Sequence, residues 1–122
     1  MPLLHGDLTE QIIGAAFEVH RILGYGFLER VYQRAMIIEL GLRGLNAQDE
    51  SKIKVYYKEH TVGDYEADLW VNEKVIVELK IAKEYNPFDE AQLLNELRAT
   101  GTRVGLLINF GREKVEFKRF IL

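Results

Sequence analysis

The sequence contains no cysteine, only two prolines and a single tryptophan. The lack of cysteine excludes disulfides, thiolate catalysis and thiolate zinc sites. No apolar run approaches the roughly 18 residues that a membrane-spanning helix needs. The first residues carry no basic segment followed by an apolar core, so we expect no signal peptide. These absences predict a protein of the cytoplasm that does not bind membranes.

An excess of positive charge is also missing. The net charge of −3 argues against a nonspecific nucleic-acid coat, which would be basic. The basic residues are unevenly spread, however, because residues 98–122 hold six of them and only two acidic ones. With 122 residues and 48% hydrophobic composition, the sequence suits one compact domain over residues 1–122.

Two runs with a period of two lie at the centre of the sequence, at residues 65–71 and 75–81. Their odd-numbered positions are all apolar or aromatic. Such alternation predicts a β-hairpin with one face in the core. Cross-strand partners point to the same face, so only a loop of odd length keeps both apolar sets together. We therefore predict a three-residue loop at 72–74, with Val71 paired to Val75.

This register brings acidic side chains together. It predicts Asp68 directly opposite Glu78, and Glu66 opposite Lys80. Like charges in opposite positions destabilise a sheet, so a partner should offset them. A divalent cation would do so, since Mg²⁺ typically binds one or two carboxylates, waters and substrate phosphates. The alternative is a solvated charged face on which Lys80 bridges the acids.

The remaining segments alternate between helical and extended patterns. Helices are predicted over 8–23, 28–42 and 87–100, and strands over 47–59, 103–109 and 113–120. In the second helix we expect an apolar stripe that packs in the core, formed by Leu28, Val31, Ala35, Ile38 and Leu42. The pattern as a whole predicts an α/β fold in which helices flank a mixed β-sheet with a central hairpin.

Three parts of the sequence resemble one known family. Asp68 followed by Glu78-Leu79-Lys80 resembles the PD-(D/E)xK signature of metal-dependent nucleases, with Ala67 in place of the usual proline. Residues 26–32 match the motif that names the GxxExxY protein family, a branch of that superfamily, and residues 14–20 and 105–111 also look like it. The resemblance runs from about residue 8 to 122 and implies a single-domain PD-(D/E)xK nuclease-like core.

The resemblance also implies a set of site residues. The catalytic set would be Glu29, Asp68, Glu78, Lys80 and Gln92. Asp68, Glu78 and Glu29 would bind Mg²⁺ (or Mn²⁺), and the Leu79 carbonyl could add another oxygen; oxygen ligands favour such a hard ion. Lys80 would orient or help deprotonate the attacking water and stabilise the charge of the transition state.

Two of these residues have a second interpretation. Glu29 could be an ordinary first-turn acid that interacts with the helix dipole. Gln92 resembles a family glutamine near the water or the substrate phosphate, and related nucleases often have a tyrosine four residues later. This sequence has Glu96 there. The departure bears on the role of Gln92 and on substrate contacts.

We therefore consider functions from different classes. The first is a Mg²⁺-dependent nuclease, a phosphodiesterase acting on nucleic acid, with DNA favoured over RNA. The second is a catalytically silent interaction module that keeps the nuclease-like fold and works as a homodimer or with a partner protein. Glu96, the acidic net charge and the small size favour the second. A weaker third is a metal-dependent hydrolase of a smaller phosphate ester.

Overall fold

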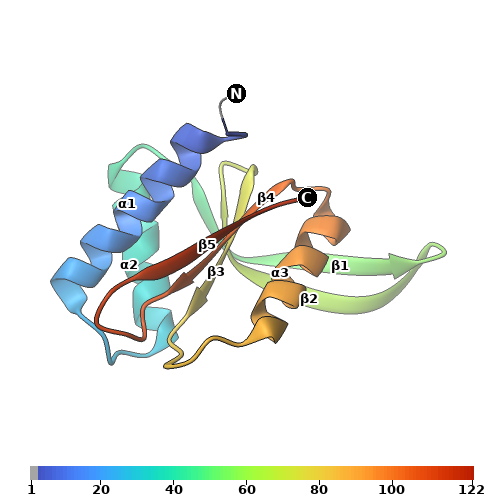
Figure 1. The fold of residues 1–122 in the computed structure, drawn as a ribbon. Coiled ribbons are helices and arrows are strands. Elements are labelled where there is room, and N and C mark those ends of the chain that lie inside the picture. Colours follow the sequence, from blue (N-terminus) through green and yellow to red (C-terminus); the bar gives the residue numbers. More distant parts are fainter. Residues whose placement is uncertain (1–2) are drawn as a thin grey trace.

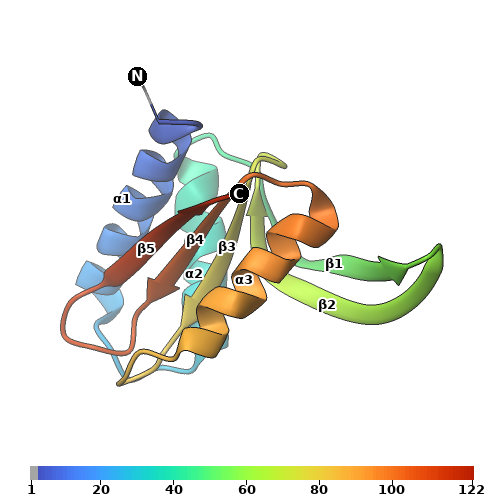
Figure 2. The same cartoon turned by 45° about the vertical axis from the view of Figure 1, so that its right-hand side comes forward.

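The computed structural model describes residues 3–122, apart from the side chain of Glu50. Its elements are α1 (Gly6–Leu23), α2 (Glu29–Leu42), β1 (Ala47–Tyr57), β2 (His60–Val71), β3 (Val75–Lys80), α3 (Pro87–Thr100), β4 (Val104–Asn109) and β5 (Glu116–Ile121). The strands form one sheet in sequence order, in which β3 and β4 are parallel and the other neighbours antiparallel. Helices α1 and α2 cover one face and α3 the other (Figures 1 and 2). The predicted α/β fold is confirmed. Across residues 3–122, no helix is both long enough and apolar enough to cross a bilayer.

Strand β3 is buried on both faces. Its odd-numbered residues pack against α1 and α2, whereas Ile76 packs against Leu93 and Leu97 of α3. The alternation had predicted only one buried face. Because β3 pairs in parallel with β4 through the α3 crossover, α3 lies over the second face, as is usual for parallel strands. A carboxylate on that face is therefore buried.

The hairpin register is confirmed over three pairs, Leu69–Val77, Trp70–Ile76 and Val71–Val75. Beyond Leu69 the two strands separate, and β2 continues only with β1. Glu66 lies opposite Lys52 of β1, so its predicted position opposite Lys80 is wrong. The ladder between β2 and β3 also ends before Asp68 and Glu78. We call this point of separation the fork.

The fork exists because β1 and β2 leave the sheet together. Residues 51–66 form a two-stranded arm that extends beyond the other strands (Figures 1 and 2). Two-stranded ribbons twist more strongly than wide sheets, which turns the arm away from β3. Tyr65 was expected in the core but is 47% exposed for this reason, and Ile81, past the end of β3, is also exposed.

The predicted core stripe of α2 is wrong. The buried residues are Tyr32, Met36 and Leu40, whereas Ile38 is 65% exposed and Leu42 is also exposed. Both stripes are apolar, so the periodicity alone could not distinguish them. Tyr32 explains the choice, because its ring stacks on Phe110 with the centroids 4.7 Å apart.

Candidate functional site

Glu78 is a deeply buried acid at the fork. It is 3% exposed, and its Oε1 has no hydrogen-bond partner among the described residues. Burial raises the pKa of Glu78, and its hydrogen bond with Glu96 and the nearby Asp68 raise it further. A charged carboxylate without a partner is costly in such a place. Glu78 therefore holds a proton near neutral pH unless a cation replaces it.

Asp68 is held from two sides at the fork. Its Oδ2 accepts a hydrogen bond of 2.8 Å from the Leu79 N–H, which replaces the missing ladder bond. Its main-chain carbonyl accepts a bond of 3.0 Å from Gln33 Nε2 of α2. Asp68 also contributes to the raised pKa of Glu78, so the two carboxyl groups are neighbours. The predicted convergence of Asp68 and Glu78 is present, but through the fork rather than a ladder pair.

Glu29 reaches the fork from the other face of the sheet. It is the first residue of α2 and is partly buried. Burial raises the pKa of Glu29, Asp68 raises it further, and Lys80 opposes the rise. Asp68 and Lys80, the charged groups with the largest effects on this pKa, are both predicted site residues. If β2 and β3 stayed paired here, the sheet would separate Glu29 from the acids on its other face. The separation of β2 from β3 therefore allows Glu29 to approach them.

The connection before α2 has a structural role of its own. Gly26 has φ of 109°, a conformation that glycine adopts without the strain of a Cβ. The Tyr32 hydroxyl donates a bond of 2.6 Å to the carbonyl of Gly24 and ties the connection to the helix. In the spacing Gly26, Glu29, Tyr32, the first and last residues thus hold the first turn of α2, and Glu29 is free to face the fork.

Lys80 is the cation nearest these acids. Its Nζ lies 3.6 Å from Asp89 Oδ1, in the first turn of α3. Burial alone lowers the pKa of Lys80, but the surrounding carboxylates, led by Asp89 and Glu78, raise it above its ordinary value. Lys80 is therefore a charged ammonium among acids, and not a neutral amine.

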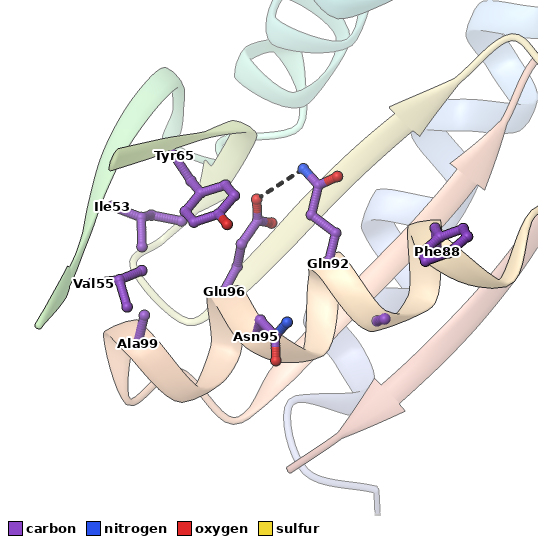
Figure 3. A pocket seen from close by; sticks show the side chains of 9 residues that line it. Ile53, Val55, Tyr65, Phe88, Gln92, Asn95, Glu96 and Ala99 are labelled. Atoms are coloured by element: carbon purple, nitrogen blue, oxygen red, sulfur yellow. Dashed lines mark hydrogen bonds between the residues drawn. The ribbon is translucent and has the colours of Figure 1, made fainter. Parts of the chain in front are cut away.

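Helix α3 adds Gln92 and Glu96. Gln92 Nε2 donates to Glu96 Oε2 at 3.3 Å, as Figure 3 shows. Glu96 is 2% exposed, and its Oε1 has no partner within residues 3–122. Burial raises the pKa of Glu96, although its hydrogen bonds with Glu78 and Gln92 oppose the rise. Gln92 is thus joined to Glu78 through Glu96.

Sequence reasoning missed that Glu96 is part of this group and noted it only as a departure. A signal was available, since Glu96 lies between Leu93 and Leu97 and one turn after Gln92, on the buried face of α3. Gln33 was missed as well. It lies one turn after Glu29 on α2, and that spacing directs both toward β2.

The donor set fits a hard divalent cation. Considering only the described residues, no group of three or more His, Asp or Glu side chains forms a ready-made metal site. Two carboxylate oxygens, Glu78 Oε1 and Glu96 Oε1, are nevertheless buried with no hydrogen bond in the described part of the chain. Mg²⁺ typically takes one or two carboxylates and completes its shell with waters and phosphate. For Leu79 the structure gives the N–H contact to Asp68, and the carbonyl ligand stays a prediction.

Comparison with known proteins gives a family match and a fold match. The model of the PD-(D/E)XK nuclease superfamily matches residues 6–120. No curated protein matches the chain. Among solved structures, the crystal structure of SSO0001 is similar, with a TM-score of 0.56 and 13% sequence identity. That match covers 96% of this chain and 58% of the other chain. At such low identity the likeness shows the fold alone.

Proposed function

The chain belongs to the PD-(D/E)XK nuclease superfamily, and from this premise we propose that it is a metal-dependent nuclease that cleaves phosphodiester bonds of nucleic acid. One observation carries the proposal. Asp68, Glu78 and Lys80 are the signature residues, they are electrostatic neighbours at the fork, and the buried Glu78 Oε1 lacks a hydrogen-bond partner in the described structure. Within the superfamily, the spacing of Gly26, Glu29 and Tyr32 supports membership of the GxxExxY family.

In this proposal Asp68, Glu78 and Glu29 hold Mg²⁺ or Mn²⁺, and the Leu79 carbonyl is a further candidate ligand. When bound, the ion would activate water and offset the charge that builds on phosphorus. The Leu79 N–H fixes one oxygen of Asp68, so the other oxygen is available for a ligand. Glu29 is partly buried beside Asp68 and Lys80, which supports a direct or water-mediated contact.

Lys80 has the role of a fixed positive charge. Its pKa is raised, so it cannot readily accept a proton from water in this arrangement. It would instead orient the attacking water and stabilise the negative charge of the transition state. Asp89, 3.6 Å away, positions the ammonium group. Gln92 would act through Glu96, which it contacts, and thereby position the carboxyl group of Glu78.

Calorimetry with Mg²⁺ and Mn²⁺ tests the metal site. We expect the wild type to bind, Asp68→Ala to lose most of the affinity, and Asp7→Ala, an exposed control on α1, to bind as the wild type does. Equal binding by wild type and Asp68→Ala would remove Asp68 from the site.

Incubation with single-stranded DNA, duplex DNA and RNA, with metal or with chelator, tests cleavage. We expect cleavage of DNA in preference to RNA, only with metal, and loss of cleavage in Glu78→Ala and Lys80→Ala. Cleavage that survives both substitutions would point to a contaminant, and the activity would then not belong to this site.

A second candidate function is a catalytically silent interaction module in the cytoplasm, acting as a homodimer or with a partner protein. The specific observation in its favour is the outward face of α2, on which Ile38 and Leu42 are exposed, together with the exposed Leu28 just before the helix. Exposed apolar faces of this kind often mark interaction sites. Sedimentation of the wild type and of Ile38→Glu would test it. A monomeric wild type that cleaves nucleic acid would contradict this alternative.

A further inference from the structure

A pocket of about 270 Å³ lies between α3 and the arm, next to the fork (Figure 3). The polar groups of the pocket all come from one side. Ile53, Val55 and Tyr65 line the side of the arm, whereas α3 contributes Gln92, Asn95 and Glu96 together with the apolar Phe88, Ala91 and Ala99. An apolar and aromatic wall opposite amide and carboxyl groups suits a flat heterocycle with a hydrogen-bonding edge. A nucleobase is such a group.

The pocket and the candidate active site share side chains. Gln92 and Glu96 line the pocket, and the carboxyl group of Glu96 is a close neighbour of that of the buried Glu78. A ligand in the pocket therefore lies beside the carboxylates at which the scissile phosphate would sit. A nucleotide strand satisfies both places at once, because its phosphates and bases alternate along the chain.

The other end of the pocket is basic. A second hollow shares Val55, Tyr65, Asn95 and Ala99 with the first and adds Lys54, Tyr56 and Arg98. Both cations are exposed, and among the side chains that the structure describes neither forms an ion pair with a carboxylate. Arg98 Nη1 instead contacts Asn95 Oδ1 at 3.0 Å. Unpaired Arg and Lys side chains suit a phosphate. The groove thus runs from acids, past an aromatic ring, to free cations.

Building on the proposed function, we propose that this groove binds single-stranded nucleic acid and holds one unpaired base against Tyr65. A base inside a duplex is stacked and paired on its Watson–Crick edge, so it must leave the helix before it can enter a pocket between a helix and a β-arm. Stacking on an aromatic ring tolerates every base. The substrate class is therefore a single strand or an unpaired flap, without strong sequence preference.

Binding in EDTA tests the proposal separately from cleavage. The probes are a fluorescein-labelled 12-nucleotide DNA strand, the RNA of the same sequence and the matching DNA duplex, measured by anisotropy at several salt concentrations. Tyr65→Ala should weaken single-strand binding about 5- to 140-fold, because stacking on an aromatic side chain contributes that much per base. Tyr65→Phe keeps the ring and should bind as the wild type does.

Arg98 has a different readout. Arg98→Ala should reduce the slope of log affinity against log salt by about 0.7, the value for one phosphate contact on a single strand. Tyr57→Ala, on the arm outside both hollows, and Arg30→Ala, exposed on α2, are the matched controls and should change nothing. Tyr65 is 47% exposed, so its substitution should leave the fold intact, as circular dichroism would check.

The outcomes separate the two proposals. If the protein binds the single strand through Tyr65 but never cleaves it in the presence of metal, the groove proposal is upheld and the nuclease proposal is refuted. If Tyr65→Ala and Arg98→Ala cleave the single strand and bind it with wild-type affinity, the groove proposal is refuted and the nuclease proposal is unaffected. If duplex binding depends on Tyr65 as strongly as single-strand binding does, the claim that Tyr65 holds an unpaired base is refuted.

Discussion

The buried acids predict an unusual dependence of stability on pH in the absence of metal. Glu78 is 3% exposed, and its pKa is raised above the ordinary value of 4.5 by burial, Glu96 and Asp68. The folded state therefore holds a proton that the unfolded state releases once the pH exceeds about 4.5. The unfolding free energy should then fall as the pH rises, until the pH reaches the raised pKa of the folded state.

The size of the Glu78 contribution follows from its one proton, and the raised pKa values of Glu96 and Glu29 change the stability in the same direction. A difference of one bound proton changes the unfolding free energy by about 1.4 kcal/mol per pH unit. Between pH 5.5 and pH 8.5 the apo protein should therefore lose about 4 kcal/mol, which is a large part of the 5–15 kcal/mol typical of a domain. This figure depends on the pH interval and not on how far the folded pKa is raised, provided that it lies above 8.5.

The Glu78→Gln substitution removes the ionisable group and keeps its shape. We expect it to flatten most of the pH dependence and to be more stable than the wild type at pH 8.5 by about 2–4 kcal/mol, since the variant does not have to take up a proton on folding. Glu10→Gln, exposed on α1, is the control and should follow the wild type.

Urea denaturation in EDTA at pH 5.5, 6.5, 7.5 and 8.5, followed by circular dichroism, measures these free energies. Added Mg²⁺ or Mn²⁺ should reduce the pH dependence of the wild type, because a bound cation replaces the proton. An unfolding free energy that is constant or rises over this range would refute the reasoning. So would a Glu78→Gln variant that is less stable than the wild type at every pH.

Three further predictions follow from contacts around the site. Gly111→Ala should destabilise the protein by about 2 kcal/mol or more in thermal unfolding, because the new Cβ would lie 2.3 Å from the main-chain carbon of Ile81, just past β3. Gly41→Ala on α2 is its control and should stabilise by about 0.5–1 kcal/mol, since the added Cβ meets no atom of the described chain within 4 Å outside its own helix backbone. Tyr32→Phe should cost about 1–2 kcal/mol in urea denaturation, because its buried hydroxyl bond of 2.6 Å is lost and an acceptor is left without a donor; an unchanged midpoint would contradict that role. Lys80→Ala should abolish cleavage but keep Mn²⁺ binding in calorimetry within a few-fold, because an ammonium group is not a ligand; loss of both would assign Lys80 to the structure of the site instead.

Local pattern in the sequence was enough for the central strands. The period of two in residues 65–71 and 75–81 determined the hairpin, and the parity of its apolar positions determined the register that pairs Val71 with Val75. The same parity put Asp68 and Glu78 on one side of the sheet. These inferences held because a β-strand has a rigid alternation, so a register error would turn every apolar side chain outward.

Only the tertiary structure decided where the ladder ends and which helix face is buried. The fork forms because β2 pairs along its whole length with β1 and only over its last residues with β3, and that is a competition between distant segments. For α2, two apolar stripes of similar period were available, and the contact of Tyr32 with Phe110 selected one of them. Glu96 joined the acids because α3 crosses over β3. Periodicity reports which side chains share a face, but the partner of that face lies elsewhere in the chain, and packing alone selects it.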